Sequence, residues 1–112
     1  METPKKLYDT NILIEARKSK KPLYGYTTIL NLIEYPKAAL FELIFLYPSK
    51  EDYKLAVKMS KELIKKGNPI PAVDILIAAM ALNRNFTMVT KDKHFLLIKD
   101  LYPQLKVEIW EE

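Results

Sequence analysis

The 112-residue chain contains no cysteine, only one histidine and no apolar run long enough to cross a membrane. Without cysteine there is no disulfide framework and no thiolate zinc site, and one histidine, His94, cannot build an imidazole-rich centre. Any metal must then be held by oxygen, which favours Mg²⁺ or Mn²⁺. The apolar stretches 75–82 and 40–47 fall far short of the roughly 20 residues of a membrane-spanning helix. We therefore expect a cytoplasmic protein without a membrane partner.

The chain also lacks internal repeats and low-complexity tracts, and its length predicts a single domain over residues 1–112. Its content of 49% hydrophobic and 29% charged residues is that of a globular protein rather than a disordered one. The net charge of +4 gives a mild attraction for polyanions. The basic residues are clustered, and the ordinary interpretation of such clusters is solubility. The clusters are Arg17, Lys18, Lys20 and Lys21; Lys65 and Lys66; and Lys91 and Lys93.

Four carboxylates interrupt apolar segments. They are Asp9 in KLYDTNILIEA, Glu34 in LNLIEYP, Asp74 in AVDILIAAMAL and Asp92 in TMVTKDKHF. Burying a charge costs several kcal/mol unless it is paired or bound to a metal, so acids in core-like sequence are expected to have a function. Four such acids suggest one shared site.

Each acid taken alone has an ordinary interpretation. Asp74 suits the first turn of a helix, Asp9 an Asx-turn or cap, and Asp92, between two lysines, a solvated surface. Glu42, also in an apolar run, serves as a control, and we expect it to reach solvent or pair with a lysine. His94, next to Phe95, is interpreted as structural.

Secondary structure follows from periodicity and capping signals. Ser49 begins a capping-box-like sequence, and apolar residues at helical spacing continue to Gly67. Thr27 or Thr28 can cap a short helix that carries Glu34, and Pro36 interrupts that helix or starts the next. We predict strands over residues 7–8, 23–27, 86–90 and 106–110, with a short one centred on Ile70. We predict helices over residues 12–17, 29–34, 38–47, 50–66, 72–83 and 93–98.

Strands separated by helices pair in parallel, with helices on both faces. The predicted fold class is therefore α/β, a three-layer α/β/α sandwich with a mainly parallel sheet. In such a sheet the ligand crevice lies at the carboxyl ends of the strands. Asp9 and Asp92 follow strands, while Glu34 and Asp74 lie near the starts of helices that follow extended segments. All four can therefore point toward one edge.

At these residues the chain resembles PIN-domain ribonucleases, and most closely the small toxins of VapBC-type toxin–antitoxin pairs. The resemblance runs almost end to end, through YDTNILIEA, YTTILNLIE, GNPIPAVDILIAAMAL and FTMVTKDKHF, with VEIW as the closing strand. The third and fourth motifs together are the most specific. The segment between Glu34 and Asp74 is shorter than usual for the group, as is the whole chain.

The resemblance implies a metal-dependent endoribonuclease in which the four acids hold one or two Mg²⁺ or Mn²⁺ ions. We expect Asp9 and Asp74 to be the primary ligands, with Asp92 and Glu34 completing the site. Asn11 and Thr90 match family positions that support it by hydrogen bonding. The expected partners are an RNA substrate, an antitoxin protein and a second copy of the chain. Lys91, Lys93, Arg17 and Lys18 are candidates for binding RNA phosphates.

The same residues bear on three other functions. A PIN-type nuclease of RNA processing or decay would share every catalytic residue, and the sequence does not separate it from a toxin. A catalytically idle binding module should have lost at least one acid, and none is missing. A receiver-type signalling domain needs adjacent acids after its first strand and a lysine after its last, which Asp9-Thr10 and VEIWEE do not supply.

Overall fold

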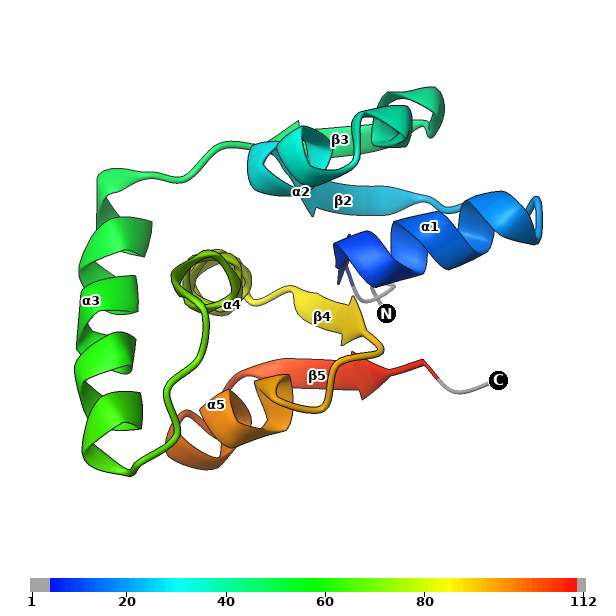
Figure 1. The fold of residues 1–112 in the computed structure, drawn as a ribbon. Coiled ribbons are helices and arrows are strands. Elements are labelled where there is room, and N and C mark those ends of the chain that lie inside the picture. Colours follow the sequence, from blue (N-terminus) through cyan, green and yellow to red (C-terminus); the bar gives the residue numbers. More distant parts are fainter. Residues whose placement is uncertain (1–4, 111–112) are drawn as a thin grey trace.

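Five parallel strands form one sheet in the computed structural model, which describes residues 5–110 (Figure 1). The strand order is β3-β2-β1-β4-β5, so β1 lies at the centre. The strands are β1 (Lys6–Tyr8), β2 (Gly25–Thr28), β3 (Leu43–Leu46), β4 (Thr87–Thr90) and β5 (Lys106–Ile109). The helices are α1 (Thr10–Lys18), α2 (Ile29–Glu34), α3 (Lys50–Lys65), α4 (Ala72–Arg84) and α5 (Phe95–Leu101), with the 3-10 helix η1 (Pro36–Leu40).

The central strands bury residues on both faces, because successive side chains point to opposite sides. Leu7 of β1 pairs with Met88 of β4, and both join the core beneath α3, α4 and α5. Their neighbours Tyr8 and Val89 pair with each other and join the core beneath α1. Helices therefore cover both faces, and the predicted α/β/α sandwich is confirmed.

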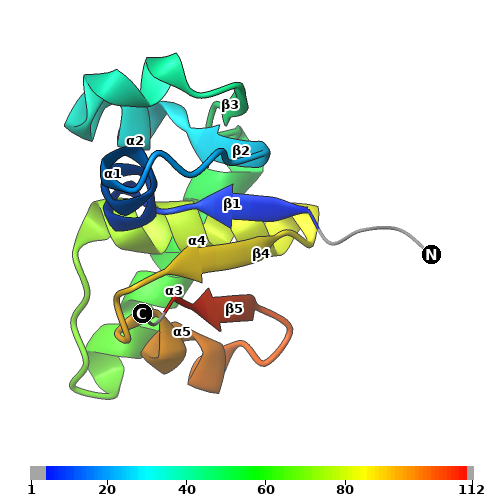
Figure 2. The ribbon, with the colours of Figure 1, turned by 90° about the vertical axis from the view of Figure 1, so that its right-hand side faces the viewer.

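The helices form two unequal layers. On one face α4 lies between α3 and the sheet (Figure 1), and residues 75–81 of α4 are all buried. On the other face α1 begins where β1 ends, while the arrows of β1, β4 and β5 run in one direction toward it (Figure 2). The carboxyl ends of β1 and β4 therefore lie beside the first turn of α1. None of the described helices combines the length and apolar character needed to span a membrane.

A close backbone approach explains the glycine at the start of β2. Gly25 has φ of +136°, and a Cβ at this position would lie 2.8 Å from the carbonyl oxygen of Lys6 in β1. Any larger residue would push β1 and β2 apart, because both the backbone conformation and the space favour glycine.

The predicted helix over residues 38–47 is wrong. The structure has η1 followed by β3, an edge strand that pairs only with β2 among the described strands. Periodicity cannot distinguish a short continuous apolar run such as Leu43–Leu46 from a buried helix. The short strand predicted around Ile70 is also absent from the described residues, although Ile70 itself is buried. Glu42 is exposed, as expected.

A buried ionic cluster joins α3 to α4. Asp52, fully buried, closes the capping box of α3, since it accepts a 2.7 Å hydrogen bond from the backbone N–H of Ser49. Its carboxylate also accepts two 3.0 Å bonds from the Arg84 guanidinium and one of 2.8 Å from the Asn83 amide. We call Asp52, Asn83 and Arg84 the Asp52 cluster.

Candidate functional site

Asp9 lies directly after β1 and caps α1. Its Oδ1 accepts a 2.9 Å hydrogen bond from the backbone N–H of Thr10, and its Oδ2 accepts a 2.7 Å bond from the hydroxyl of Thr90. The carboxyl is buried, with 7% of the residue exposed. Two hydrogen bonds and the positive end of the α1 dipole compensate part of the cost of burying this charge.

Thr90 and Asn11 connect the end of β4 to α1. The Thr90 hydroxyl donates to Asp9 and accepts a 3.0 Å hydrogen bond from the backbone N–H of Asp92. The Asn11 side chain accepts a 3.2 Å bond from the backbone N–H of Lys91. The loop that carries Asp92 is therefore held beside Asp9 through both of these side chains.

Asp74 reaches the same place from the first turn of α4. Its Oδ2 lies 3.0 Å from Nε2 of His94, while Nδ1 of the same ring lies 3.2 Å from Oδ2 of Asp92. Ligand atoms of these three residues lie within 4.8 Å of one another. The single histidine of the chain thus lies between two of the acids.

Glu34 approaches from the end of α2. Its Oε1 accepts a 2.9 Å hydrogen bond from the hydroxyl of Thr10, which in turn accepts a 3.0 Å bond from the amide of Asn31. Asn31 is fully buried and is also the capping-box partner of Thr28. A chain of polar side chains therefore links Glu34 to the residue next to Asp9.

We call Asp9, Glu34, Asp74 and Asp92 the acid cluster, and burial together with the charges of neighbouring acids raises the pKa values of Asp9 and Asp74. Burial raises the pKa of Asp9, and the charges of Glu34 and Asp92 raise it further against the opposing hydrogen bonds. Burial likewise raises the pKa of Asp74, and the charges of the other three acids add to this. His94 acts in the opposite direction on Asp74. The four carboxyls are thus close enough to affect one another.

The donor set fits a divalent cation. Hard carboxylate oxygens converge from four elements, and their repulsion favours a positive charge between them. In addition, His94 Nε2 is buried and has no hydrogen-bond partner among residues 5–110. Asp9, Glu34, Asp74, Asp92 and His94 are the residues available to hold such an ion.

Three residues of the site were not assigned to it from the sequence. Thr10 and Asn31 support Glu34, and the capping-box spacing of Thr28 and Asn31 was an available signal for the second of these. His94 follows Asp92 by two residues, a spacing that could have marked it. The expectation that all four acids are buried is only partly met, because Glu34 is exposed and the Asp92 side chain is 43% exposed.

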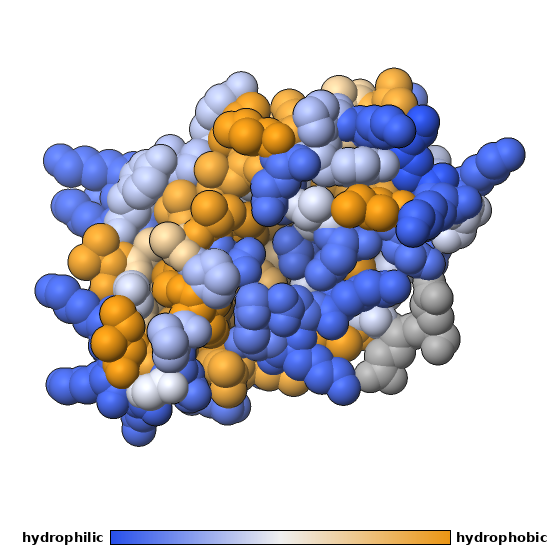
Figure 3. Space-filling view, viewed as in Figure 1, coloured by the Kyte–Doolittle hydropathy of each residue, from blue (hydrophilic) through white to orange (hydrophobic). Residues whose placement is uncertain are grey.

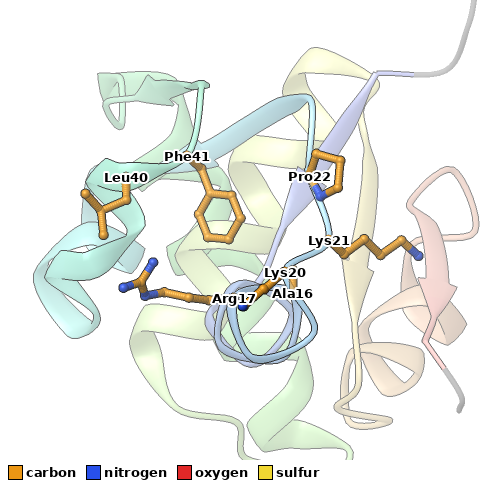
Figure 4. Close-up of a pocket in the computed structure, with 7 residues that line it drawn as sticks. All are labelled: Ala16, Arg17, Lys20, Lys21, Pro22, Leu40 and Phe41. Carbon is orange, nitrogen blue, oxygen red and sulfur yellow. The ribbon is translucent and has the colours of Figure 1, made fainter.

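The predicted RNA-binding residues occupy two places. Lys91 lies beside the acid cluster with its Nζ 3.5 Å from Glu15, and Lys93 is exposed in the same loop. Arg17 and Lys18 are exposed in the last turn of α1, about 12 Å from Asp9 along the helix. Arg17 extends across a cavity of about 300 Å³ toward Leu40, and the Phe41 ring faces this cavity (Figure 4). It is lined by Ala16, Arg17, Lys20, Lys21, Pro22, Leu40 and Phe41.

Comparisons by sequence identify no relative. No protein-family model matches the chain, and no curated protein matches it. Comparisons of the fold do find similar solved structures, and these span the chain almost completely.

The similar structures come from toxin–antitoxin complexes. A chain of VapBC2 from Rickettsia felis, bound to a DNA fragment from its promoter, is 22% identical with a TM-score of 0.76, over 95% of this chain and 98% of that one. A chain of VapBC-5 from Mycobacterium tuberculosis is 17% identical with a TM-score of 0.75, over 96% and 100%. A chain of VapBC-1 from nontypeable Haemophilus influenzae is 22% identical with a TM-score of 0.72, over 96% and 98%. The chain therefore shares the three-layer α/β/α fold of these structures.

Proposed function

We propose that this chain is a single-domain, metal-dependent endoribonuclease that hydrolyses RNA phosphodiesters as the toxin of a type II toxin–antitoxin pair. The observation that supports this most is the convergence of four carboxylates, from β1–α1, α2, α4 and the loop after β4, at the carboxyl edge of the sheet. That edge is where ligands bind in open α/β folds.

The residues divide the chemistry among them. Asp9 and Asp74 are the primary carboxylate ligands, and Asp92 and Glu34 complete the site. A bound Mg²⁺ or Mn²⁺ supplies a more acidic water and offsets negative charge on the phosphate oxygens. Asn11 and Thr90 hold the Asp92 loop against Asp9, so that two acids distant in sequence keep a constant separation.

Glu34 is the better placed proton acceptor. Hydrolysis requires the oxygen of water to attack phosphorus, one P–O ester bond to break, and a base to take the proton of the water. Both Asp92 oxygens face His94, one toward its backbone N–H and one toward its ring. Glu34 is exposed, and within residues 5–110 its carboxylate accepts a hydrogen bond from Thr10 through Oε1. Its second oxygen is therefore the one we propose to take the proton.

The charge around the site suits a polyanion. In this proposal Lys91 and Lys93 contact the phosphates next to the cleaved bond, and Arg17 and Lys18 contact RNA farther along α1. These contacts would make RNA affinity fall as the salt concentration rises.

A protein partner is also part of the proposal. The similar structures are VapBC complexes, which supports an antitoxin for this chain. Hydrophobic atoms gather over α3 and α4 in the view of Figure 3, where a cleft of about 300 Å³ includes Tyr53, Val57 and Leu76. The resemblance implies a homodimer, but the predicted apolar helix over residues 38–47 that would have supported it does not exist. The dimer therefore now depends on such exposed apolar residues, and the molar mass in solution tests it.

The activity is tested by incubating purified protein with structured and unstructured RNAs in Mg²⁺, in Mn²⁺ or in EDTA. We expect cleavage only with a divalent cation, and at least about 100-fold slower cleavage by Asp9→Asn and Asp74→Asn. Glu42→Gln is the matched control, because Glu42 is an exposed acid outside the acid cluster. Cleavage that persists in both aspartate variants would indicate a contaminating nuclease and remove support for this function.

A further inference from the structure

His94 is placed like a ligand rather than like a core histidine. Its ring lies between two carboxylates, with Nε2 at 3.0 Å from Asp74 Oδ2 and Nδ1 at 3.2 Å from Asp92 Oδ2. It precedes α5, and its side chain is 25% exposed. Both ring nitrogens therefore face the acid cluster.

The contact between Nε2 and Asp74 lacks hydrogen-bond geometry. Nε2 is buried, yet it has no hydrogen-bond partner within residues 5–110 despite an oxygen 3.0 Å away. Two ligands at right angles around an ion with bonds of about 2.1 Å lie about 3.0 Å apart. The separation of these two atoms is thus that of neighbouring ligands of one small cation.

The ring is held in this orientation by the local chain. The backbone N–H of His94 donates a 3.1 Å hydrogen bond to Asp92 Oδ1. The imidazole also lies against the Phe95 ring, with centroids 4.9 Å apart, and Phe95 is fully buried. A nitrogen fixed by its neighbours can bind a metal ion without a large loss of side-chain entropy.

We propose that His94 is a nitrogen ligand of the divalent cation in this site, so that the site prefers Mn²⁺ to Mg²⁺. The inference rests on the proposed function, because it assumes a cation among the carboxylates. Imidazole binds first-row transition ions, whereas Mg²⁺ favours oxygen ligands and keeps its waters. A site made only of carboxylate oxygens is compatible with either Mg²⁺ or Mn²⁺. A nitrogen ligand from His94 favours Mn²⁺.

Pulsed electron paramagnetic resonance of bound Mn²⁺ tests the proposal directly, without RNA. His94 is the single histidine of the chain, so in tag-free protein an imidazole nitrogen signal has only one source. We expect nitrogen modulation in the wild type and its loss in His94→Gln. The ratio of Mn²⁺ to Mg²⁺ affinity should fall at least about tenfold in that variant. Asp100→Asn, an exposed acid on α5, is the control and should keep both properties.

The outcomes separate this proposal from the nuclease proposal. Mn²⁺ that binds in an Asp74-dependent manner without nitrogen modulation overturns the role of His94 and leaves the carboxylate site standing. The same holds if His94→Gln weakens Mn²⁺ and Mg²⁺ equally, because His94 would then only position the two aspartates. Absence of any specific Mn²⁺ binding overturns both proposals.

Discussion

Buried carboxylates occur in two places in the molecule, and their pKa values shift in opposite directions. In the Asp52 cluster, hydrogen bonds from Arg84, Ser49 and Asn83 outweigh the effect of burial and lower the pKa of Asp52 to about 2. In the acid cluster, burial and neighbouring negative charges raise the pKa values of Asp9 and Asp74. The Arg84 guanidinium neutralises Asp52, whereas the acids of the second cluster repel one another.

This difference separates stability from function. A paired buried acid holds α3 against α4, and removing its partner leaves an uncompensated charge. Clustered acids without a fixed cation cost stability, and such arrangements are common at functional sites. Disrupting the Asp52 cluster should therefore lower the free energy of unfolding, whereas removing a charge from the metal-free acid cluster should raise it.

The largest expected effect is on the Asp52 cluster. Arg84→Met should lower the free energy of unfolding by about 3 to 5 kcal/mol, because Asp52 stays buried without its cation. Urea denaturation measures this. The control Lys54→Met, which removes an exposed ion pair with Glu51, should cost less than about 1 kcal/mol. Similar losses in both variants would show that Asp52 is not stabilised by its partner.

The next largest effect should be the loss of unfolding free energy at low pH. The pKa of Asp52 is about 2 in the folded protein against 3.8 for the free side chain. Its stabilising contribution is therefore fully present above about pH 4 and lost as the pH falls toward 2. It amounts to about 2 kcal/mol. Unfolding free energies measured between these pH values should show this loss in the wild type and not in Asp52→Asn.

Thr90→Val should cost about 1 to 2 kcal/mol, because a buried hydroxyl that serves both Asp9 and the Asp92 amide is lost. RNA cleavage should also slow, since the Asp92 loop loses one of its supports. Thr90→Ser keeps the hydroxyl and should retain most of both properties. Unfolding and cleavage assays on the two variants check this, and an unaffected Thr90→Val protein would argue against a supporting role.

The smallest effect should have the opposite sign. Asp9 has a raised pKa, so its ionised form destabilises the metal-free fold as the pH rises above the ordinary carboxyl range. Asn retains the helix cap and removes the charge. In EDTA near neutral pH, Asp9→Asn should be more stable than the wild type by roughly 0.5 to 1 kcal/mol. If Asp9→Asn were less stable than the wild type in EDTA, Asp9 would be a stabilising carboxylate like Asp52.

The general fold and the position of the site followed from local rules. Asp9 directly follows β1 and Asp92 lies two residues after the end of β4, and parallel strands end at one edge of the sheet. The Ser49 capping box and Gly67 predicted α3 nearly to the residue. These features depend on residues near one another in sequence, which is why they could be read in advance.

Other features depend on tertiary pairing. The segment Leu43–Leu46 becomes a strand because it pairs with β2, whereas its apolar residues alone are equally compatible with a helix. Asp52 belongs to the capping-box-like sequence that begins at Ser49, but its buried ion pair depends on Arg84, 32 residues later. His94 was interpreted as structural because nothing in the sequence places Asp74 beside it.

The proposed function requires the acid cluster to bind a divalent cation. Isothermal titration calorimetry of the metal-free protein with Mn²⁺ tests this most directly. The wild type and Glu42→Gln should show the same saturable binding, and Asp74→Asn should bind at least about tenfold more weakly. No saturable binding to the wild type, or equal binding to Asp74→Asn, would contradict the account.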